Sequence, residues 1–257
     1  MAAALSRRDR LRAATVAEIK EIARRYLVAD GPSAISLRAI ARDMGMSAPS
    51  LYRYFPSLDT LITELTADAY DSVRSAMEVA RDATPADDTL GRLVAVSRAF
   101  RQWAVAHPAE FSLAFGTPPP GRDMTYTKQQ KPDDGAADPN LRAMQACGEA
   151  GTRFGAVFAQ LFIELWTRRP FPTPAREEIP PRLRVQLGAL AEELGGVLPM
   201  PAVFVYLSCW TQLYGMVALE VFGHQRWALT DAEPLFEAEL AAMIRRLDPP
   251  AAGSDGR

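Results

Sequence analysis

The chain has 257 residues and a mass of 28.2 kDa, and 48% of its residues are hydrophobic while 23% are charged. This balance is typical of a globular protein with one or two domains, and it excludes a disordered chain and a small disulfide scaffold. The two cysteines, Cys147 and Cys209, provide no covalent framework. The two histidines, His107 and His224, leave little material for a metal site. We therefore expect no cofactor, no bound metal and a cytoplasmic location without a secretory signal.

Charge is distributed unevenly along the chain. Residues 1–58 hold ten Lys and Arg against five Asp and Glu, a balance of +5, whereas the remaining residues hold nineteen against twenty-six, a balance of −7. A basic head on an acidic body predicts that only the head approaches a polyanion. Chance clustering of basic residues on a solvated helix is the alternative on this feature alone.

Hydrophobic periodicity and the placement of Pro and Gly predict helices throughout. No segment shows the sustained alternation of a strand. In chain order, the predicted helices span residues 8–29, 37–44, 48–55, 58–81, 86–106, 109–115, 139–167, 181–194, 201–222 and 231–247. The expected fold class is all-α.

The two short helices near the N-terminus predict a helix-turn-helix, whose second helix lies in the major groove of DNA. Ala41 is small where the two helices cross, and Gly45 can adopt the left-handed conformation that ends the first helix. Ser36, Ser47 and Ser57 are predicted N-caps of three successive helices.

The second short helix is expected to turn Leu51 and Phe55 inward and its other side chains toward DNA. Tyrosine hydroxyls can donate hydrogen bonds to phosphates, arginines can contact phosphate or guanine, and Ala48 or Pro49 can touch a thymine methyl. Any helical pair with a glycine turn can imitate this pattern, but the caps, the small crossing residue and the tyrosines agree here. The predicted DNA-contacting residues are Ser36, Arg38, Ser47, Ala48, Pro49, Ser50, Tyr52, Arg53 and Tyr54.

Residues 8–65 resemble the DNA-binding domain of the TetR family of transcriptional regulators. The residues that carry the resemblance are Ile22-Ala23, Gly31, Leu37–Met46, Ser47–Phe55 and Leu61. One departure is Leu58, which stands where the family commonly has a Lys or Arg that binds a phosphate. The resemblance implies that three N-terminal helices bind operator DNA, and that a helical body dimerises and holds a small effector whose binding releases the DNA.

The body also resembles one subgroup of the family, which has a WHG-type C-terminal ligand-binding domain. The matching residues are His107–Phe111 with Phe115-Gly116, and Trp210 with Tyr214-Gly215. We therefore expect a helix-turn-helix DNA-binding domain at 1–57, a helical-bundle domain for ligand binding and dimerisation at 58–248, and a flexible tail at 249–257.

A group of aromatic and small side chains is the candidate effector pocket. Gly148, Gly151 and Gly155 in the predicted helix 139–167 either admit a neighbouring helix or leave a void. Such a lining favours a small hydrophobic or aromatic effector, although a stripe of Met and aromatic residues is also typical of plain core. The predicted lining residues are Trp103, Phe111, Phe115, Met144, Cys147, Phe154, Phe158, Tyr206, Trp210 and Tyr214.

The last two predicted helices are candidates for a subunit interface. Residues 201–222 have one charge, Glu220, and are long enough to span a membrane, but Ser208 and Thr211 favour a buried helix instead. Thr230 and Glu233 have the spacing of a capping box at the start of the last helix. Two helices from each subunit would form a four-helix interface, although both apolar stripes could also be core within one chain. The predicted interface residues are Val203, Leu207, Leu219, Phe236, Leu240, Met243, Ile244 and Leu247.

These patterns predict a homodimeric, sequence-specific regulator of transcription, with double-stranded operator DNA and a small effector as partners and no membrane. We expect a repressor that the effector releases. An activator of the same family is one alternative, and an all-α ligand carrier or enzyme is another. The sequence has no Gly-rich phosphate loop, nucleophile elbow or HExxH motif, so we expect no catalytic residues.

Overall fold

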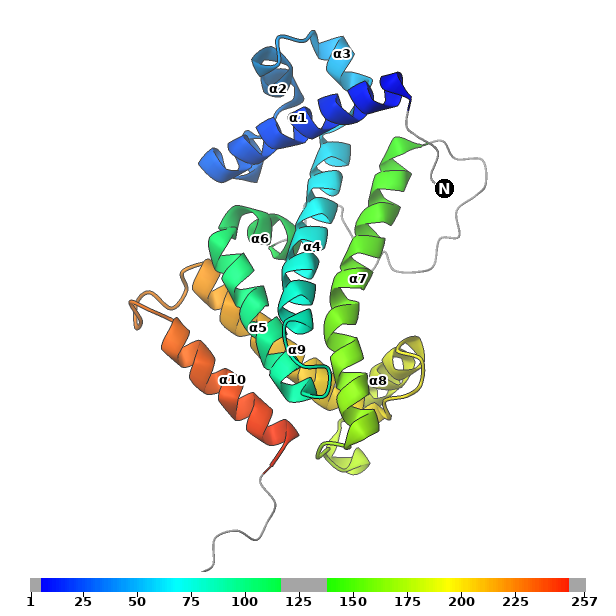
Figure 1. Cartoon of the computed structure of the whole chain (residues 1–257), viewed down its shortest axis with the longest axis vertical. Helices are drawn as coiled ribbons and strands as arrows, with labels where there is room; N and C mark the ends of the chain where they lie inside the picture. Colours follow the sequence, from blue (N-terminus) through cyan, green and yellow to red (C-terminus); the bar gives the residue numbers. More distant parts are fainter. Residues whose placement is uncertain (1–5, 117–137, 250–257) are drawn as a thin grey trace, which may run out of the picture. The chain divides into compact units, whose positions relative to one another are not determined.

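The computed structural model describes residues 6–116 and 138–249. These residues form ten α-helices and two short 3-10 helices, with no strand among them (Figure 1). The all-α class is therefore confirmed. The helices are α1 (Arg7–Asp30), α2 (Leu37–Asp43), α3 (Ala48–Tyr52), α4 (Leu58–Asp82), α5 (Thr89–Ala106), α6 (Pro108–Phe115), α7 (Pro139–Arg168), α8 (Pro181–Glu193), α9 (Met200–Val221) and α10 (Glu233–Leu247), with 3-10 turns at Pro32–Ala34 and Arg176–Glu178.

Helix α3 is shorter than its periodicity predicts, because it ends at Tyr52 instead of Phe55. The backbone amides of Tyr54 and Phe55 still donate to the Leu51 carbonyl, at 2.9 and 3.1 Å, so the chain continues as a tight turn. Pro56 follows, and a proline disfavours helical geometry in the residue before it. The turn nevertheless keeps Phe55 on the side of the chain that packs inward.

Only one of the three predicted serine caps is confirmed. The Thr60 amide donates to the Ser57 hydroxyl at 3.0 Å, at the start of α4. Ser36 and Ser47 precede α2 and α3 as predicted, but neither side chain accepts a hydrogen bond from a backbone amide of its helix. The Ser47 hydroxyl instead forms a hydrogen bond with the Ser50 hydroxyl at 2.8 Å.

The predicted capping box at the start of α10 is wrong. The helix begins at Glu233, and the Asp231 carboxylate accepts the Glu233 amide hydrogen at 2.9 Å. The carboxylate of Asp231, two residues before Glu233, thus accepts an amide hydrogen at the helix start, which is what Thr230 was expected to do.

The chain divides into two compact units: residues 1–72 with 107–153, and residues 73–106 with 154–257. Helices α4 and α7 each contribute residues to both units. The predicted boundary after residue 57 coincides with the start of α4, whereas the helix-turn-helix shares its unit with α6 and the first half of α7. The predicted tail lies outside the described residues except for Pro249.

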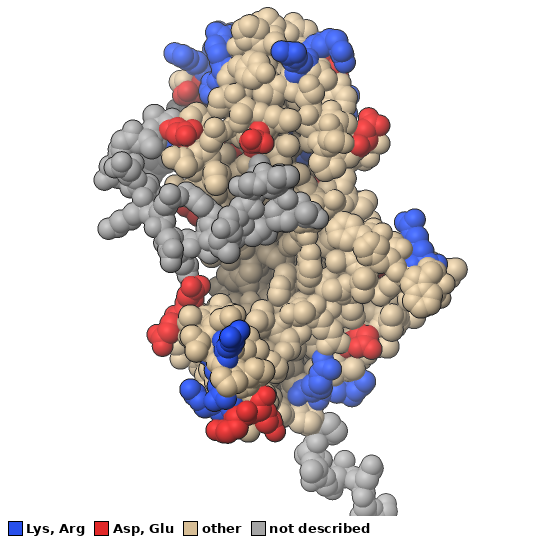
Figure 2. Space-filling view, turned by 180° about the vertical axis from the view of Figure 1, so that it is seen from behind, with Lys and Arg blue, Asp and Glu red and all other residues tan. Residues whose placement is uncertain are grey.

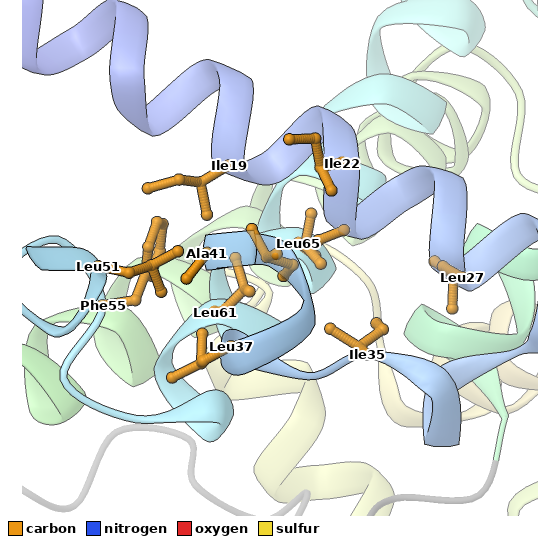
Figure 3. Packing of buried hydrophobic residues seen from close by; sticks show 12 residues of the cluster. Ile19, Ile22, Leu27, Ile35, Leu37, Ala41, Leu51, Phe55, Leu61 and Leu65 are labelled. Atoms are coloured by element: carbon orange, nitrogen blue, oxygen red, sulfur yellow. The ribbon is translucent and has the colours of Figure 1, made fainter. Parts of the chain in front are cut away.

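The core of the first unit joins α1 to the helix-turn-helix and to the beginning of α4. Figure 3 shows Leu51 and Phe55 beside Ile19 of α1, with Ala41 close by. Ala41 is buried, as its predicted place at the helix crossing requires. Two residues of α6, Ala109 and Leu113, pack against the same cluster.

In the second unit, α9 packs against α5 and α8, and α10 packs against α5 and α9. Arg101 of α5 is buried and donates to Glu220 of α9 at 2.7 and 2.8 Å and to Glu233 of α10 at 3.0 Å. The hydrogen bonds to these carboxylates, Glu220 first, raise the pKa of Arg101 further above its ordinary value. This ion-pair cluster joins all three helices at one end of the unit.

Among the described helices, α9 alone is long and apolar enough to cross a membrane by length and composition, and 28% of its most apolar stretch is buried in the chain.

The turn between α2 and α3 depends on Gly45. Its φ is +63°, a left-handed conformation that a side chain disfavours. The Gly45 amide donates to the Arg42 carbonyl at 3.1 Å, and the Met46 amide donates to the Ala41 carbonyl at 2.8 Å. This pair of bonds is the Schellman motif, which satisfies the last carbonyls of α2 and turns the chain toward α3.

We expect Gly45→Ala to lower the free energy of unfolding by about 1 kcal/mol, because alanine must adopt the left-handed conformation. Gly188→Ala in α8 is the control, since a Cβ at either glycine meets no atom within 4 Å and Gly188 has no positive φ. Alanine within a helix should be neutral or stabilising there. Urea unfolding of both variants makes the comparison, and equal stability of Gly45→Ala and the parent chain would refute this role of the turn.

Candidate nucleic-acid interface

Burial on one side of α3 leaves its other side exposed. Leu51 and the following Phe55 are almost fully buried in the core of the first unit. Tyr52 is 44% exposed, and Arg53 is exposed beside it. The short helix therefore presents a polar, aromatic and cationic surface on the side opposite its buried residues.

All nine residues predicted to contact DNA are at least partly accessible. Arg38, Ser47, Pro49, Tyr52 and Arg53 are exposed. The partly exposed members are Ser36, Ala48, Ser50 and Tyr54. Their direct contact with DNA stays a prediction, and the structure places them around α3 and the starts of α2 and α3.

Helix α1 adds basic residues that the sequence reasoning did not include in the site. An open groove of about 620 Å³ lies between the first two turns of α1 and the end of α3. The guanidinium of Arg12 lies 5.2 Å from the centre of the Tyr54 ring, within the range of a cation–π contact. The spacing of Arg8 and Arg12, four residues apart on one helix face, is the pattern that could have revealed them. The groove is lined by Arg7, Arg8, Leu11, Arg12, Thr15, Arg53 and Tyr54.

Other basic residues of the head are engaged within the protein. Lys20 lies 3.0 Å from both Glu64 and Asp68 of α4, and Arg24 lies 2.7 Å from Asp68. These pairs attach α1 to α4 and neutralise positive charge on the side of α1 that faces α4.

The arginines around α3 keep their charge available. Arg7, Arg8, Arg38 and Arg53 form no ion pair with any residue that the structure describes. Figure 2 shows Lys and Arg side chains gathered at the end of the first unit that carries α1, α2 and α3. Phosphates of a nucleic acid favour such a surface.

Contacts within the first unit fix the orientation of the head. The Tyr26 hydroxyl donates to the Asp43 carboxylate at 2.7 Å, which joins the ends of α1 and α2 and raises the pKa of Tyr26 above its ordinary value. At the start of α4, Ser57 and Thr60 both donate to the side-chain oxygen of Asn140 in α7. The helix-turn-helix is thus held by helices that come before and after it in the chain.

The predicted pocket residues fall into two groups. In the second unit, Trp210 packs against Phe154, Phe158 and Tyr214, with ring centres 5.5–5.9 Å apart, and Phe100 joins this cluster. In the first unit, Phe111 and Phe115 have ring centres 5.0 Å apart. The other predicted residues are Trp103, which is buried, Tyr206, which contacts Phe162, and Met144 and Cys147, which are half-buried on α7.

The aromatic cluster of the second unit fills its own interior. The cavity beside Phe158, Tyr206 and Trp210 measures about 10 Å³, enough for one water at most. Sites for small ligands usually measure about 300–1,000 Å³. Burial raises the pKa of Tyr206, and that of Cys209 to about 11, so both groups are neutral at pH 7. This interior is apolar, and a ligand would have to separate its rings.

The predicted interface residues also divide into two groups. Leu219 is exposed, and Leu207 and Ile244 are partly exposed. The other members lie in the core of their own unit, as the alternative of an intrachain stripe requires. These buried residues are Val203, Phe236, Leu240, Met243 and Leu247.

Comparison with known proteins gives a consistent result over both parts of the chain. Residues 12–65 match the family model of bacterial regulatory proteins, tetR family, and residues 93–243 match the model of the tetracyclin repressor-like C-terminal domain. The chain is 33% identical over 232 residues to the HTH-type transcriptional regulators Mb1846 of Mycobacterium bovis and Rv1816 of Mycobacterium tuberculosis, which covers 89% of this chain and 90% of each relative.

Solved structures agree with these matches. The candidate regulatory protein SCO4313 is 31% identical, with a TM-score of 0.67 over 93% of this chain and 98% of that one. A regulatory protein in the tetR family from Rhodococcus RHA1 is 14% identical and shares the fold, with a TM-score of 0.53 over 90% of this chain and 96% of that one.

We expect Arg8→Ala and Arg12→Ala each to weaken binding to any DNA duplex, because the groove on α1 is suited to the sugar-phosphate backbone. The slope of log affinity against log salt concentration should become shallower by about 0.9 for each phosphate contact that is lost. Titration of a random-sequence duplex at several salt concentrations measures this slope. Arg25→Ala, at an exposed position late in α1, is the control, and an equal change in the control would remove the groove from the interface.

Proposed function

Because the chain belongs to the TetR family of bacterial regulatory proteins and is therefore a transcriptional regulator, we propose that it is a repressor that a small hydrophobic or aromatic effector releases from its operator. Regulators of this family bind operator DNA and are dimeric. The finer proposal concerns how this chain uses its own residues for DNA contact, dimerisation and release.

The observation that carries the proposal is the exposed face of α3 beside the arginines of α1. Tyr52 and Arg53 lie on the side of the helix away from Leu51, next to the groove that Arg8 and Arg12 line. In this arrangement α3 reads base edges in the major groove, while α1 and the starts of the short helices hold the flanking phosphates.

A single copy of this surface is small, because α3 has five residues. Two copies on a twofold axis bind two half-sites as one unit, which raises affinity without new kinds of contact. The incomplete burial of the apolar helix α9 supports a second subunit as its neighbour. We therefore propose a homodimer in the cytoplasm, with α9 in the subunit interface.

Effector binding is proposed to act through the aromatic cluster of the second unit. A ligand that enters there must separate Phe100 of α5, Phe158 of α7 and Trp210 of α9. Helix α4 gives a direct route to the head, since its Leu61 lies in the head core and its Met77 is buried about four-fifths of the way along the helix. The ligand must prefer the state that does not bind DNA, because equal affinity for both states shifts nothing.

The roles of Tyr52 and Arg53 are separable by experiment. We expect Tyr52→Phe to weaken binding to all sequences to a similar extent, because its hydroxyl donates to a phosphate. Arg53→Ala should relax the preference at one base pair, because its guanidinium reads a guanine. Each loss should be on the order of 1–3 kcal/mol.

Gel-shift titration of a preferred duplex, selected from a random pool, and of its single-base variants measures both effects. Arg25→Ala is again the control. A uniform loss across all duplexes for Arg53→Ala would contradict base reading by Arg53. A parent protein that selects no sequence from the pool would contradict the proposed operator binding as a whole.

A further inference from the structure

One face of α9 is open along its whole length. Its residues recur every three or four positions, so they share one side of the helix, and each is exposed or half-buried. Bulky residues occupy the two ends of this face and small ones its middle, where a Cβ on Gly215 would meet no atom within 4 Å. We define the α9 face as Phe204, Ser208, Thr211, Gly215, Leu219 and Phe222.

A groove lies beside the N-terminal end of this face. Its volume is about 730 Å³, and its walls come from the connector before α8, the first half of α9 and the end of α10. The apolar part of its lining includes Pro172, Pro174, Phe204 and Val205. We define this site as the proline groove, and its size suits a large aromatic side chain.

Trp227 lies at the opposite end, in the turn that follows α9. Its side chain is 89% exposed, and it forms no hydrogen bond or ring contact with any residue that the structure describes. Tryptophan has a large apolar ring and is enriched among the residues that dominate binding at protein interfaces. The ring cannot reach the proline groove of its own chain, because Phe204 and Phe222 are about 27 Å apart along the helix.

Charges at the two ends of α10 are complementary. Asp231 lies just before its start, close in sequence to Trp227, and is exposed. Arg245 and Arg246 lie at its end, where they line the proline groove. A second copy in antiparallel orientation therefore brings the acidic end of one α10 to the basic end of the other.

We propose that Trp227 of each protomer inserts into the proline groove of a second copy of this chain. The inference rests on the proposed dimeric regulator and names the contact that fixes its register. Two α9 helices cross antiparallel near Leu213, which is equally distant in sequence from Phe204 and Phe222. Phe204 then faces the partner's Phe222, the small Ser208 accommodates the partner's Leu219, and the two Trp227 rings close the interface at both ends.

The first test compares three variants by their dimer dissociation constants in sedimentation equilibrium. Trp227→Ala is expected to weaken the dimer about 30-fold or more, as for a residue that dominates an interface. Gly215→Leu is expected to abolish the dimer, because leucine blocks the crossing of the α9 faces, and a Cβ at this position meets no atom of its own chain within 4 Å. Val185→Ala, at an exposed apolar residue of α8, should leave the constant unchanged.

These results separate the two proposals. A dimer that Gly215→Leu disrupts and Trp227→Ala does not would overturn the Trp227 contact and leave the α9 dimer standing. Dimers that survive both substitutions, or a parent chain that is monomeric, would overturn the proposed α9 interface as well.

A second test locates the contact directly. In a chain with Cys147→Ser and Cys209→Ala, the pair Trp227→Cys and Pro174→Cys should form a covalent dimer under mild oxidation by copper phenanthroline, which removes two thiol hydrogens for each disulfide. Because the two positions lie at opposite ends of α9 in one chain, this bond forms only between copies. Absence of the cross-linked dimer overturns the proposal. The occupant of the groove would then be another one, either residues 250–257 of this chain or another protein.

Discussion

The burial of Leu51 and Phe55 against α1 is the constraint on which the rest of the structure depends. A helix as short as α3 has little stability of its own, so its packing against Ile19 and its neighbours determines its orientation. When these apolar side chains are buried, Tyr52 and Arg53 must face outward. The exposed surface of α3 is therefore a consequence of the core of the head, and the left-handed turn at Gly45 gives α3 the direction in which it can pack.

The distribution of charge adds selectivity to this geometry. Lys20 and Arg24 form ion pairs with Glu64 and Asp68 of α4. Four other arginines of the head form no ion pair with any described residue: Arg7, Arg8, Arg38 and Arg53. The ion pairs of Lys20 and Arg24 attach the head to a helix that continues into the second unit. We propose that helix α4 transmits a change in the aromatic cluster to the surface around α3.

The glycine turn and the inward positions of α3 could be predicted from the sequence, because they depend on neighbouring residues. The exact helix ends could not, since two of the three serine caps and the end of α3 differ from the prediction. Features that depend on packing between distant parts of the chain could not be predicted from the sequence. The apolar stripe of α10 has the same periodicity whether it meets its own chain or another, and Phe236 and Leu240 proved to be buried internally. The aromatic residues near Trp210 were recognisable as a cluster, but periodicity does not reveal how tightly side chains fill a space. The sequence did not single out Trp227 as an interface residue, because the exposure of one residue in a turn produces no periodic pattern in the sequence.

The central claim is that paired copies of α3 present the surface around Tyr52 and Arg53 to successive major grooves on one side of the DNA. Hydroxyl-radical footprinting of genomic fragments with the purified protein tests it most directly. The account predicts two protected half-sites whose centres are about 34–36 Å apart or a multiple of that distance, with protection that Tyr52→Phe weakens in both halves. Uniform protection along every fragment, or a single unpaired protected site, would contradict it.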